Sequence, residues 1–172
     1  MIKTHIIEIE TGNEAHAIRA ATECWEVFVT VTWVGNSGQV VDYLSAQPDH
    51  DLNIFSSHGD ESGLLLPKLA DEIAERYPYN DVIRPQDFAQ FLRLNGNVVI
   101  NLSCMGGMQQ LAEVFLAHEA QCYIGPVDYP SGGAALMYVL DFLYNYIHNG
   151  QNVKESHRIA SSHKVAMFAT CA

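Results

Sequence analysis

A cysteine at the end of a predicted strand is the residue of this chain best suited to covalent chemistry. Residues 97–107 form an apolar run of strand character that ends at Ser103-Cys104, and Gly106-Gly107 then open a predicted helix. A thiol at the carboxyl end of a buried strand, beside a helix amino terminus, lies where the peptide dipole and free N–H groups favour the thiolate. Cys104 is therefore a candidate nucleophile.

A histidine lies in the equivalent position one predicted strand earlier. Residues 52–58 form another strand-like run, which ends at His58-Gly59. Cysteine catalysis needs a group that transfers protons and N–H donors that bind the oxyanion. His58 is a candidate for the first role, and the backbone N–H groups of Gly59 and Cys104 are candidates for the second. Glycine suits this position because a residue without Cβ lets a substrate carbonyl approach the main chain closely.

Predicted strands and helices alternate along the chain before and after His58 and Cys104. This alternation favours an α/β sandwich with a mainly parallel sheet. The strands are predicted over residues 6–9, 25–34, 52–58, 97–104 and 121–127, and the helices over residues 13–23, 37–47, 68–76, 85–94, 134–149 and 153–163. A further helix, with apolar positions between Met108 and Leu116, is predicted to follow Gly106-Gly107. A short hairpin or edge strand is predicted over residues 62–67, and the tail 165–172 is either a sixth strand or a docked terminus. Ligands bind at the carboxyl ends of such strands, so His58, Cys104 and Asp128 are expected at one edge.

Composition restricts the classes of partner. Twenty acidic residues against nine Lys plus Arg give a net charge of −11, which disfavours nucleic acid and anionic membranes. A hydrophobic share of 48% and a charged share of 17% predict a single globular domain over residues 1–172 rather than a disordered chain. The excess of acid also leaves open a basic peptide as substrate or partner.

The cysteines and histidines predict neither a metal site nor a disulfide framework. Cys24, Cys122 and Cys171 are irregularly spaced and are expected to be structural, so no cofactor or metal is expected. The amino terminus has no signal-like apolar core, and Asp141 and Asn145 interrupt the longest apolar run. A cytoplasmic location without membrane contact is therefore the expectation. Histidines other than His58 are expected at the surface or at helix ends.

The order of these motifs resembles the caspase-like (clan CD) cysteine peptidases, in which a His-Gly pair precedes the catalytic cysteine by one strand. The chain looks most like the CHAT domains within that group. The matching stretches are Ser62-Gly-Leu-Leu-Leu, Val98-Val-Ile-Asn-Leu-Ser-Cys, the helix and strand of residues 111–128, and the helix of residues 134–150. CHAT domains usually have an acidic residue and then Thr-Gly after the cysteine, where this chain has Met105-Gly106-Gly107.

The resemblance implies a fold, an activity and a set of roles. The fold would be a three-layer α/β/α sandwich with a mainly parallel, caspase-like central sheet of five to six strands. The activity would be that of a cysteine endopeptidase acting on a peptide or protein substrate through an acyl-thioester. His58 would be the proton shuttle and Cys104 the nucleophile, and Gly59 and Cys104 would supply the oxyanion hole. Oligomeric state and the preferred residue at the cleaved bond stay open.

Several alternatives accompany this interpretation. Asp128 either binds a basic substrate side chain, as acidic residues do in arginine-preferring relatives, or caps the helix that follows Pro130. The whole domain could be a caspase-like binding or scaffold module without turnover. Ser103-Cys104-Met105-Gly106 also faintly resembles the nucleophile elbow of class I glutamine amidotransferases, in which His157 or His163 would have to serve as the base.

Overall fold

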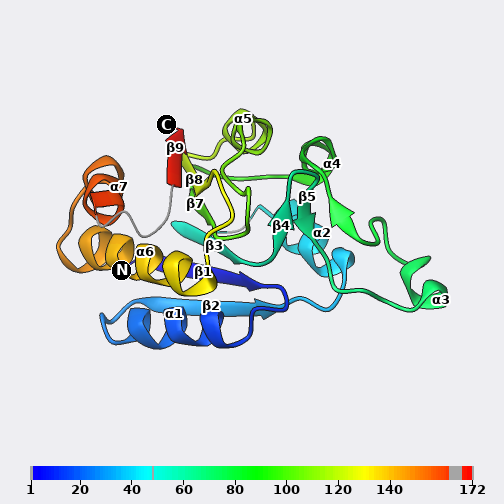
Figure 1. The fold of residues 1–172 in the computed structure, drawn as a ribbon, viewed down its shortest axis with the longest axis horizontal. Helices are drawn as coiled ribbons and strands as arrows, with labels where there is room; N and C mark the ends of the chain where they lie inside the picture. Colours follow the sequence, from blue (N-terminus) through cyan, green and yellow to red (C-terminus); the bar gives the residue numbers. More distant parts are fainter. Residues whose placement is uncertain (1, 48, 163–167, 172) are drawn as a thin grey trace.

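A six-stranded sheet forms the centre of the structure, a computed structural model that describes residues 2–47, 49–162 and 168–171 (Figure 1). In spatial order its strands are β2 (Phe28–Trp33), β1 (Lys3–Glu8), β3 (Leu52–Ser56), β7 (Val98–Asn101), β8 (Cys122–Pro126) and β9 (Phe168–Cys171). Neighbours among the first five strands are parallel, and β9 pairs antiparallel with β8. The α/β prediction with five to six mainly parallel strands is confirmed.

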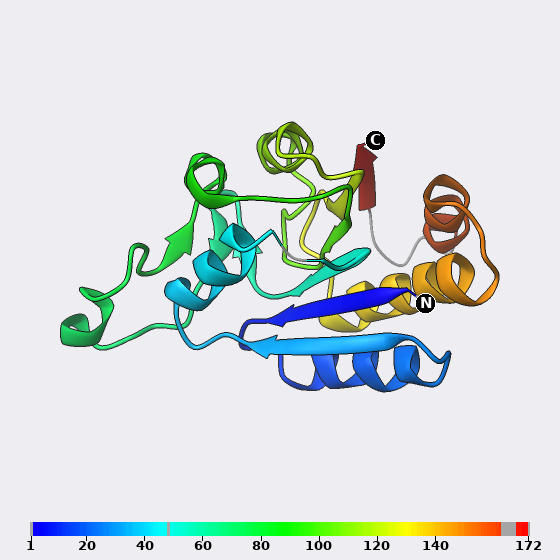
Figure 2. The same ribbon diagram turned by 180° about the vertical axis from the view of Figure 1, so that it is seen from behind.

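Helices cover both faces of this sheet and form the outer two layers. One apolar core lies under α2 (Ser37–Ser45), α4 (Pro85–Phe91) and α5 (Gln109–Ala117). The other lies under α1 (Asn13–Glu23), α6 (Gly132–Leu143), its π-helical continuation η1 (Tyr144–His148) and α7 (Val153–Ser162). Helices α1 and α6 lie in front of the sheet in Figure 1 and behind it in Figure 2, where α2 is in front.

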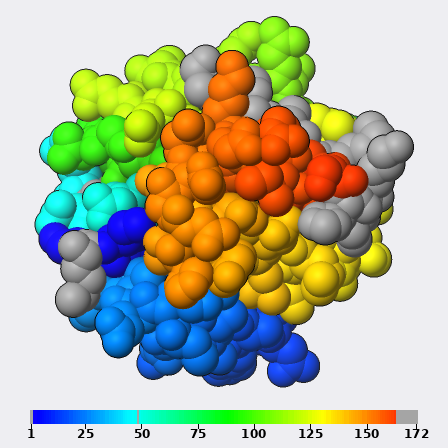
Figure 3. All heavy atoms as spheres, turned by 90° about the vertical axis from the view of Figure 1, so that its left-hand side faces the viewer, coloured from blue at the N-terminus to red at the C-terminus, as the bar shows by residue number. Residues whose placement is uncertain are grey.

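The strands between the two cores carry apolar side chains on both faces, as buried parallel strands do. All five residues of β3 and all four of β7 are buried. The outer surface over the second core consists of α6, η1 and α7, next to α1 (Figure 3).

Within the part of the chain that is described, no helix is both long and apolar enough to span a membrane.

A small second sheet follows β3 directly. It contains β4 (Gly59–Asp60), β5 (Gly63–Leu65) and β6 (Val82–Ile83), all antiparallel, and therefore confirms the predicted hairpin. The predicted helix of residues 68–76 shrinks to α3 (Asp71–Ala74), in an arm that extends away from the central sheet (Figures 1 and 2). The hairpin begins at Gly59, directly after His58.

Gly12 occupies the N-cap of α1, and Asn36 caps α2 by accepting the Gln39 N–H. In the tail, β9 covers residues 168–171, so the predicted sixth strand exists over that part, whereas residues 163–167 lie outside the described chain.

Candidate active site

The pairing of β3 with β7 brings together the histidine corner, which is His58-Gly59, and the cysteine corner, which is Ser103-Cys104. The two strands are parallel neighbours with Phe55 opposite Asn101, and each corner lies three residues beyond this pair. At Gly59, a Cβ atom would lie 2.7 Å from the Cys104 backbone oxygen and 2.8 Å from Ser103 Oγ. Any side chain would therefore collide with the cysteine corner, which explains the glycine after His58.

The cysteine loop, which we define as residues 104–107, also contacts the loop that follows β8. The Met105 N–H donates to the Asp128 backbone oxygen over 3.1 Å. The Asp128 side chain is exposed and accepts the Tyr129 N–H at 2.7 Å. Ser131 rather than Asp128 caps α6, with its Oγ accepting the Ala134 N–H, so the capping interpretation of Asp128 is wrong.

A buried hydrogen-bond network holds the cysteine loop from below. Asn101 Oδ1 accepts both the Ser103 N–H (3.0 Å) and the Ser103 hydroxyl (2.6 Å), and Asn101 Nδ2 donates to Tyr123 Oη. Tyr123 in turn donates to the Gly106 backbone oxygen over 2.6 Å. Since Asn101 and Tyr123 are almost fully buried, these bonds are costly to lose and fix the position of Cys104.

Close packing explains the two glycines and leaves one strained residue. A Cβ at Gly107 would lie 2.2 Å from the Gly125 backbone oxygen, so the loop can approach β8 only without a side chain there. Met105, directly after Cys104, has a φ of 57°, in the left-handed region that is unfavourable for residues with a Cβ. Strain of this kind clusters at functional sites.

Glu14 joins the site although no local sequence pattern pointed to it. It lies in the first turn of α1, where Ser56 Oγ donates to its Oε1 over 3.2 Å. Burial raises the pKa of Glu14, and both the Ser56 hydrogen bond and the charge of nearby His58 act in the opposite direction. The only available signal was the position of α1 after the carboxyl end of β1, which becomes informative once the strand order is known.

The turn before α1 has its own anchor. Glu8, at the end of β1, is 6% exposed, and its Oε1 accepts the N–H groups of Thr11 (2.6 Å) and Gly12 (2.7 Å). Thr11 Oγ1 also donates to the Ser56 backbone oxygen. These contacts fix the start of α1 against β3 and thereby place Glu14 beside the histidine corner.

The electrostatics of this corner favour a neutral thiol at rest. Burial raises the pKa of Cys104, the carboxylates of Asp128 and Glu14 raise it further, and the residue's own N–H acts in the opposite direction. Tyr129 shares the acidic surroundings, because a hydrogen bond to Glu61 and weak burial raise its pKa to about 12. A half-buried Cys104 thus needs a base to become nucleophilic.

His58 itself is exposed, so its ring is accessible to a substrate at the edge of the sheet. Other predicted histidines behave differently. His157 Nδ1 lies 2.7 Å from Tyr138 Oη on the α6–α7 side, and His163 lies outside the described residues, so nothing supports an amidotransferase base. His5 is 4% exposed, which makes the expectation of a surface position wrong for this residue.

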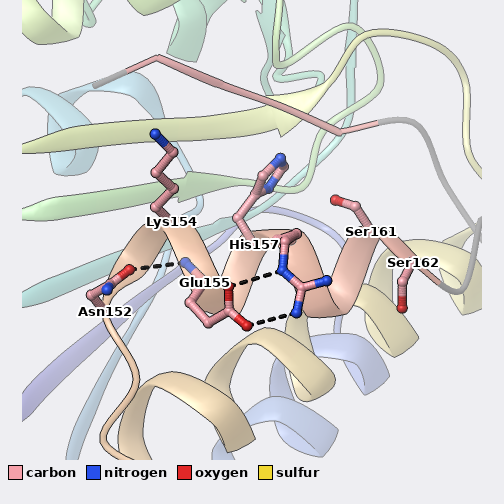
Figure 4. A pocket seen from close by; sticks show the side chains of 7 residues that line it. Asn152, Lys154, Glu155, His157, Ser161 and Ser162 are labelled. Carbon is pink, nitrogen blue, oxygen red and sulfur yellow. Dashed lines mark hydrogen bonds and ion pairs between the residues drawn. The ribbon is translucent and has the colours of Figure 1, made fainter.

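Neither a metal cluster nor the α7 pocket competes with this site. Among the described residues, no group of three or more His, Cys, Asp or Glu side chains is arranged to hold a metal ion. A cavity of about 590 Å³ lies along α7 (Figure 4), but its Arg158 is paired with Glu155. That cavity contains none of the residues of the His58 and Cys104 corners.

Two solved structures resemble this chain over 94% of its length. Gingipain R, an Arg-specific cysteine proteinase, matches with a TM-score of 0.61 at 9% identity over 42% of its own chain. A secreted C11 cysteine protease from Bacteroides thetaiotaomicron, solved with an irreversible peptide inhibitor, matches with a TM-score of 0.55 at 14% identity over 58% of its own chain. The present chain therefore spans about half the length of these proteins.

No protein-family model and no curated protein sequence matches the chain. At such low identities the structural likeness defines the fold alone, and that fold is the caspase-like α/β sandwich of the clan CD cysteine peptidases. The predicted resemblance to clan CD is confirmed at this level, whereas the narrower likeness to CHAT domains stays a prediction.

Proposed function

We propose that the chain is a cysteine endopeptidase in which Cys104 is the nucleophile and His58 the proton shuttle. The observation that carries this proposal is the contact between Gly59 and the Ser103-Cys104 corner, described above. It supports a site at which a carbonyl carbon can approach the thiol and an imidazole together. The cysteine protease fold of the two structural relatives supports the same class of reaction.

The raised pKa of the Cys104 thiol favours general-base catalysis over a standing thiolate–imidazolium pair. His58 takes the thiol proton as Cys104 Sγ attacks the peptide carbonyl, and the N–H groups of Gly59 and Cys104 bind the oxyanion. His58 then gives the proton to the departing amine, which leaves the acyl-thioester. Water attacks the thioester as His58 removes its proton, and return of that proton to the sulfur releases the carboxylic acid. Glu14 stabilises the transient imidazolium.

The acidic surroundings of Cys104 favour a substrate with a basic side chain at the cleaved bond. Asp128 is exposed at the corner, and Glu14, Asp60 and Glu61 lie near the same thiol or near Tyr129. A Lys or Arg side chain is attracted by these carboxylates. The arginine specificity of gingipain R supports the same choice.

A fluorogenic peptide panel with basic, acidic and apolar residues before the scissile bond tests the proposal. Cleavage is expected after basic residues, Cys104→Ala should reduce it to background, and His58→Ala should lower kcat/KM by at least about a thousandfold. Cys24→Ala and His148→Ala are matched controls on exposed residues and should retain full activity. Retained hydrolysis in His58→Ala contradicts the dyad, and preference for acidic residues contradicts the role of Asp128.

A binding module without turnover is the second candidate, and the raised pKa of the Cys104 thiol favours it. In that case the peptides bind without being cleaved. Cleavage that is lost in Cys104→Ala supports the peptidase.

A further inference from the structure

An apolar cavity lies beside the cysteine loop, between α5 and the segment that follows β8. Its volume is about 540 Å³, and Met108, Ala112, Leu116 and Val127 supply its apolar walls. Ala112 is buried beneath it, Met108 and Leu116 are half-buried, and Val127 is 37% exposed. A cavity lined in this way gains free energy when an apolar group displaces its water.

Two backbone hydrogen bonds connect this cavity to the candidate active site. The Gly107 N–H donates to the Pro126 oxygen over 2.7 Å, and the Met105 N–H donates to the Asp128 oxygen over 3.1 Å. The cysteine loop and residues 126–128 therefore run side by side, and Val127 lies between the two acceptors. Gly107 at the end of the loop also lines the cavity, so the cavity begins three residues from Cys104.

Distance along an extended peptide determines which substrate residue can reach this cavity. An extended chain advances about 3.3 Å per residue, so a residue two or three positions from the scissile bond lies roughly 7–10 Å away. The cysteine loop is compact, because the Gly106 N–H donates to the Ser103 oxygen and the Met108 N–H to the Met105 oxygen, so the cavity stays close to Cys104. One large aliphatic or aromatic side chain fits the available volume.

We propose that this cavity is a second substrate subsite, which binds an apolar side chain two or three residues from the scissile bond. The proposal rests on the proposed peptidase function and extends it to a two-point recognition. The corner around Asp128 selects the side chain at the cleaved bond, and the cavity at Val127 selects a Leu, Ile, Met or Phe further along the peptide. Glu113 at the rim of the cavity disfavours an acidic side chain there.

Cleavage kinetics test the subsite directly. All peptides of the series have the same basic residue before the scissile bond. Each pair of peptides differs at one position, which is Leu in one peptide and Ala in the other, within three residues of the scissile bond on either side. We expect about tenfold higher kcat/KM for Leu at one of the second or third positions. Val127→Glu should reduce the ratio of kcat/KM for the Leu peptide to that for the Ala peptide to about one, and Val127→Ile should retain the ratio of the unmodified chain. Met137→Glu, which adds the same charge at an exposed apolar residue of α6, is the matched control.

A binding measurement separates the subsite from the catalytic proposal. In the inactive Cys104→Ala variant, the Leu peptide should bind about tenfold more tightly than the Ala peptide, again only with an intact Val127. Cleavage without any Leu preference overturns the subsite and leaves the peptidase standing. Preferential binding without cleavage by the unmodified chain supports the subsite and overturns the peptidase. If the chain neither cleaves the peptides nor binds the Leu peptide more tightly than the Ala peptide, the subsite proposal is overturned as well.

Discussion

The two ends of the central sheet both carry histidine and other polar side chains, but these differ in how far they are exposed to solvent. At the carboxyl ends of the strands, His58 is exposed and Cys104 is half-buried. Near the amino ends of β1 and β3, His5 lies 4% exposed beneath α2, with its ring stacked on Tyr43 at a centroid distance of 4.0 Å. One histidine is accessible and the other is enclosed.

The enclosed cluster forms a chain of hydrogen bonds across three strands. Thr30 Oγ1 lies 2.5 Å from His5 Nδ1 and 3.1 Å from His50 Nε2. Tyr43 Oη lies 3.2 Å from His50 Nδ1 and donates to Asn53 Oδ1 over 2.6 Å. These groups therefore bond to one another within the protein, although His5 Nε2 and Asn53 Nδ2 are buried without a hydrogen-bond partner. At the cysteine corner, by contrast, burial and the carboxylates of Asp128 and Glu14 raise the pKa of a half-buried thiol.

The difference teaches that a histidine and hydroxyl groups do not by themselves make a site. Parallel strands end at the edge where loops, helix amino termini and carboxylates converge, whereas the opposite end is closed by packing. Each prediction below changes one of the two ends.

The largest effect is expected for Gly59→Ala. The new methyl group must displace the Cys104 carbonyl or the Ser103 side chain, because both lie under 3 Å from it. We expect kcat/KM for the best peptide to fall about a hundredfold, as on loss of an oxyanion donor. Gly133→Ala, where a Cβ meets nothing within 4 Å, should retain activity. An active Gly59→Ala protein contradicts the contact between the two corners.

A low pH should reduce the free energy of unfolding through the buried histidine, His5. Burial, with the charge of His50 as a smaller cause, lowers the pKa of His5 from 6.5 to about 4. The pKa of His5 is lower in the folded protein than in the unfolded chain, so protonation of His5 destabilises the fold. The stability that neutral His5 provides is therefore fully present above pH 6.5 and is lost as the pH falls towards 4. The loss amounts to at most about 3 kcal/mol.

Urea unfolding between pH 7.5 and pH 4 measures this loss. His5→Gln should flatten the pH dependence and leave cleavage of the best peptide unaffected at neutral pH. His148→Gln, at an exposed position, is the control and should unfold like the unmodified chain. An unchanged pH profile in His5→Gln shows that His5 does not cause the acid sensitivity.

A smaller effect is expected for Asp128→Asn. Removal of this carboxylate lowers the pKa of the Cys104 thiol, because a nearby negative charge disfavours the thiolate. Alkylation of Cys104 by iodoacetamide near pH 8 should therefore accelerate about two- to threefold, while cleavage after basic residues becomes weaker. Asp42→Asn on α2 should change neither rate. Slower alkylation in Asp128→Asn contradicts the electrostatic account of the corner.

The smallest effect is expected for Met105→Gly. Glycine adopts a φ of 57° without steric cost, although it also increases the entropy of the unfolded chain. The two effects partly cancel, so the free energy of unfolding should change by less than about 1 kcal/mol. A large loss of stability would show that the Met105 side chain, rather than its backbone, is important at this end of the sheet.

The sequence by itself determined the fold class and the two corners. Alternation of apolar strands with amphipathic helices predicts the parallel sheet, since local periodicity depends on which face each element buries. His58-Gly59 and Ser103-Cys104 were visible because both follow buried strands directly. Element ends were less accurate, as the helix over residues 68–76 shows by shrinking to four residues.

Only the tertiary structure decided which residues surround Cys104. Glu14 is distant in sequence and reaches the corner because β1 lies beside β3, a strand order that no local pattern encodes. Helix capping by Ser131 frees Asp128 for the site, and enclosure by α2 turns His5 from an expected surface residue into a buried one. Periodicity reports the burial of a residue's own element, whereas contacts between distant elements arise from their packing, which is a property of the whole chain.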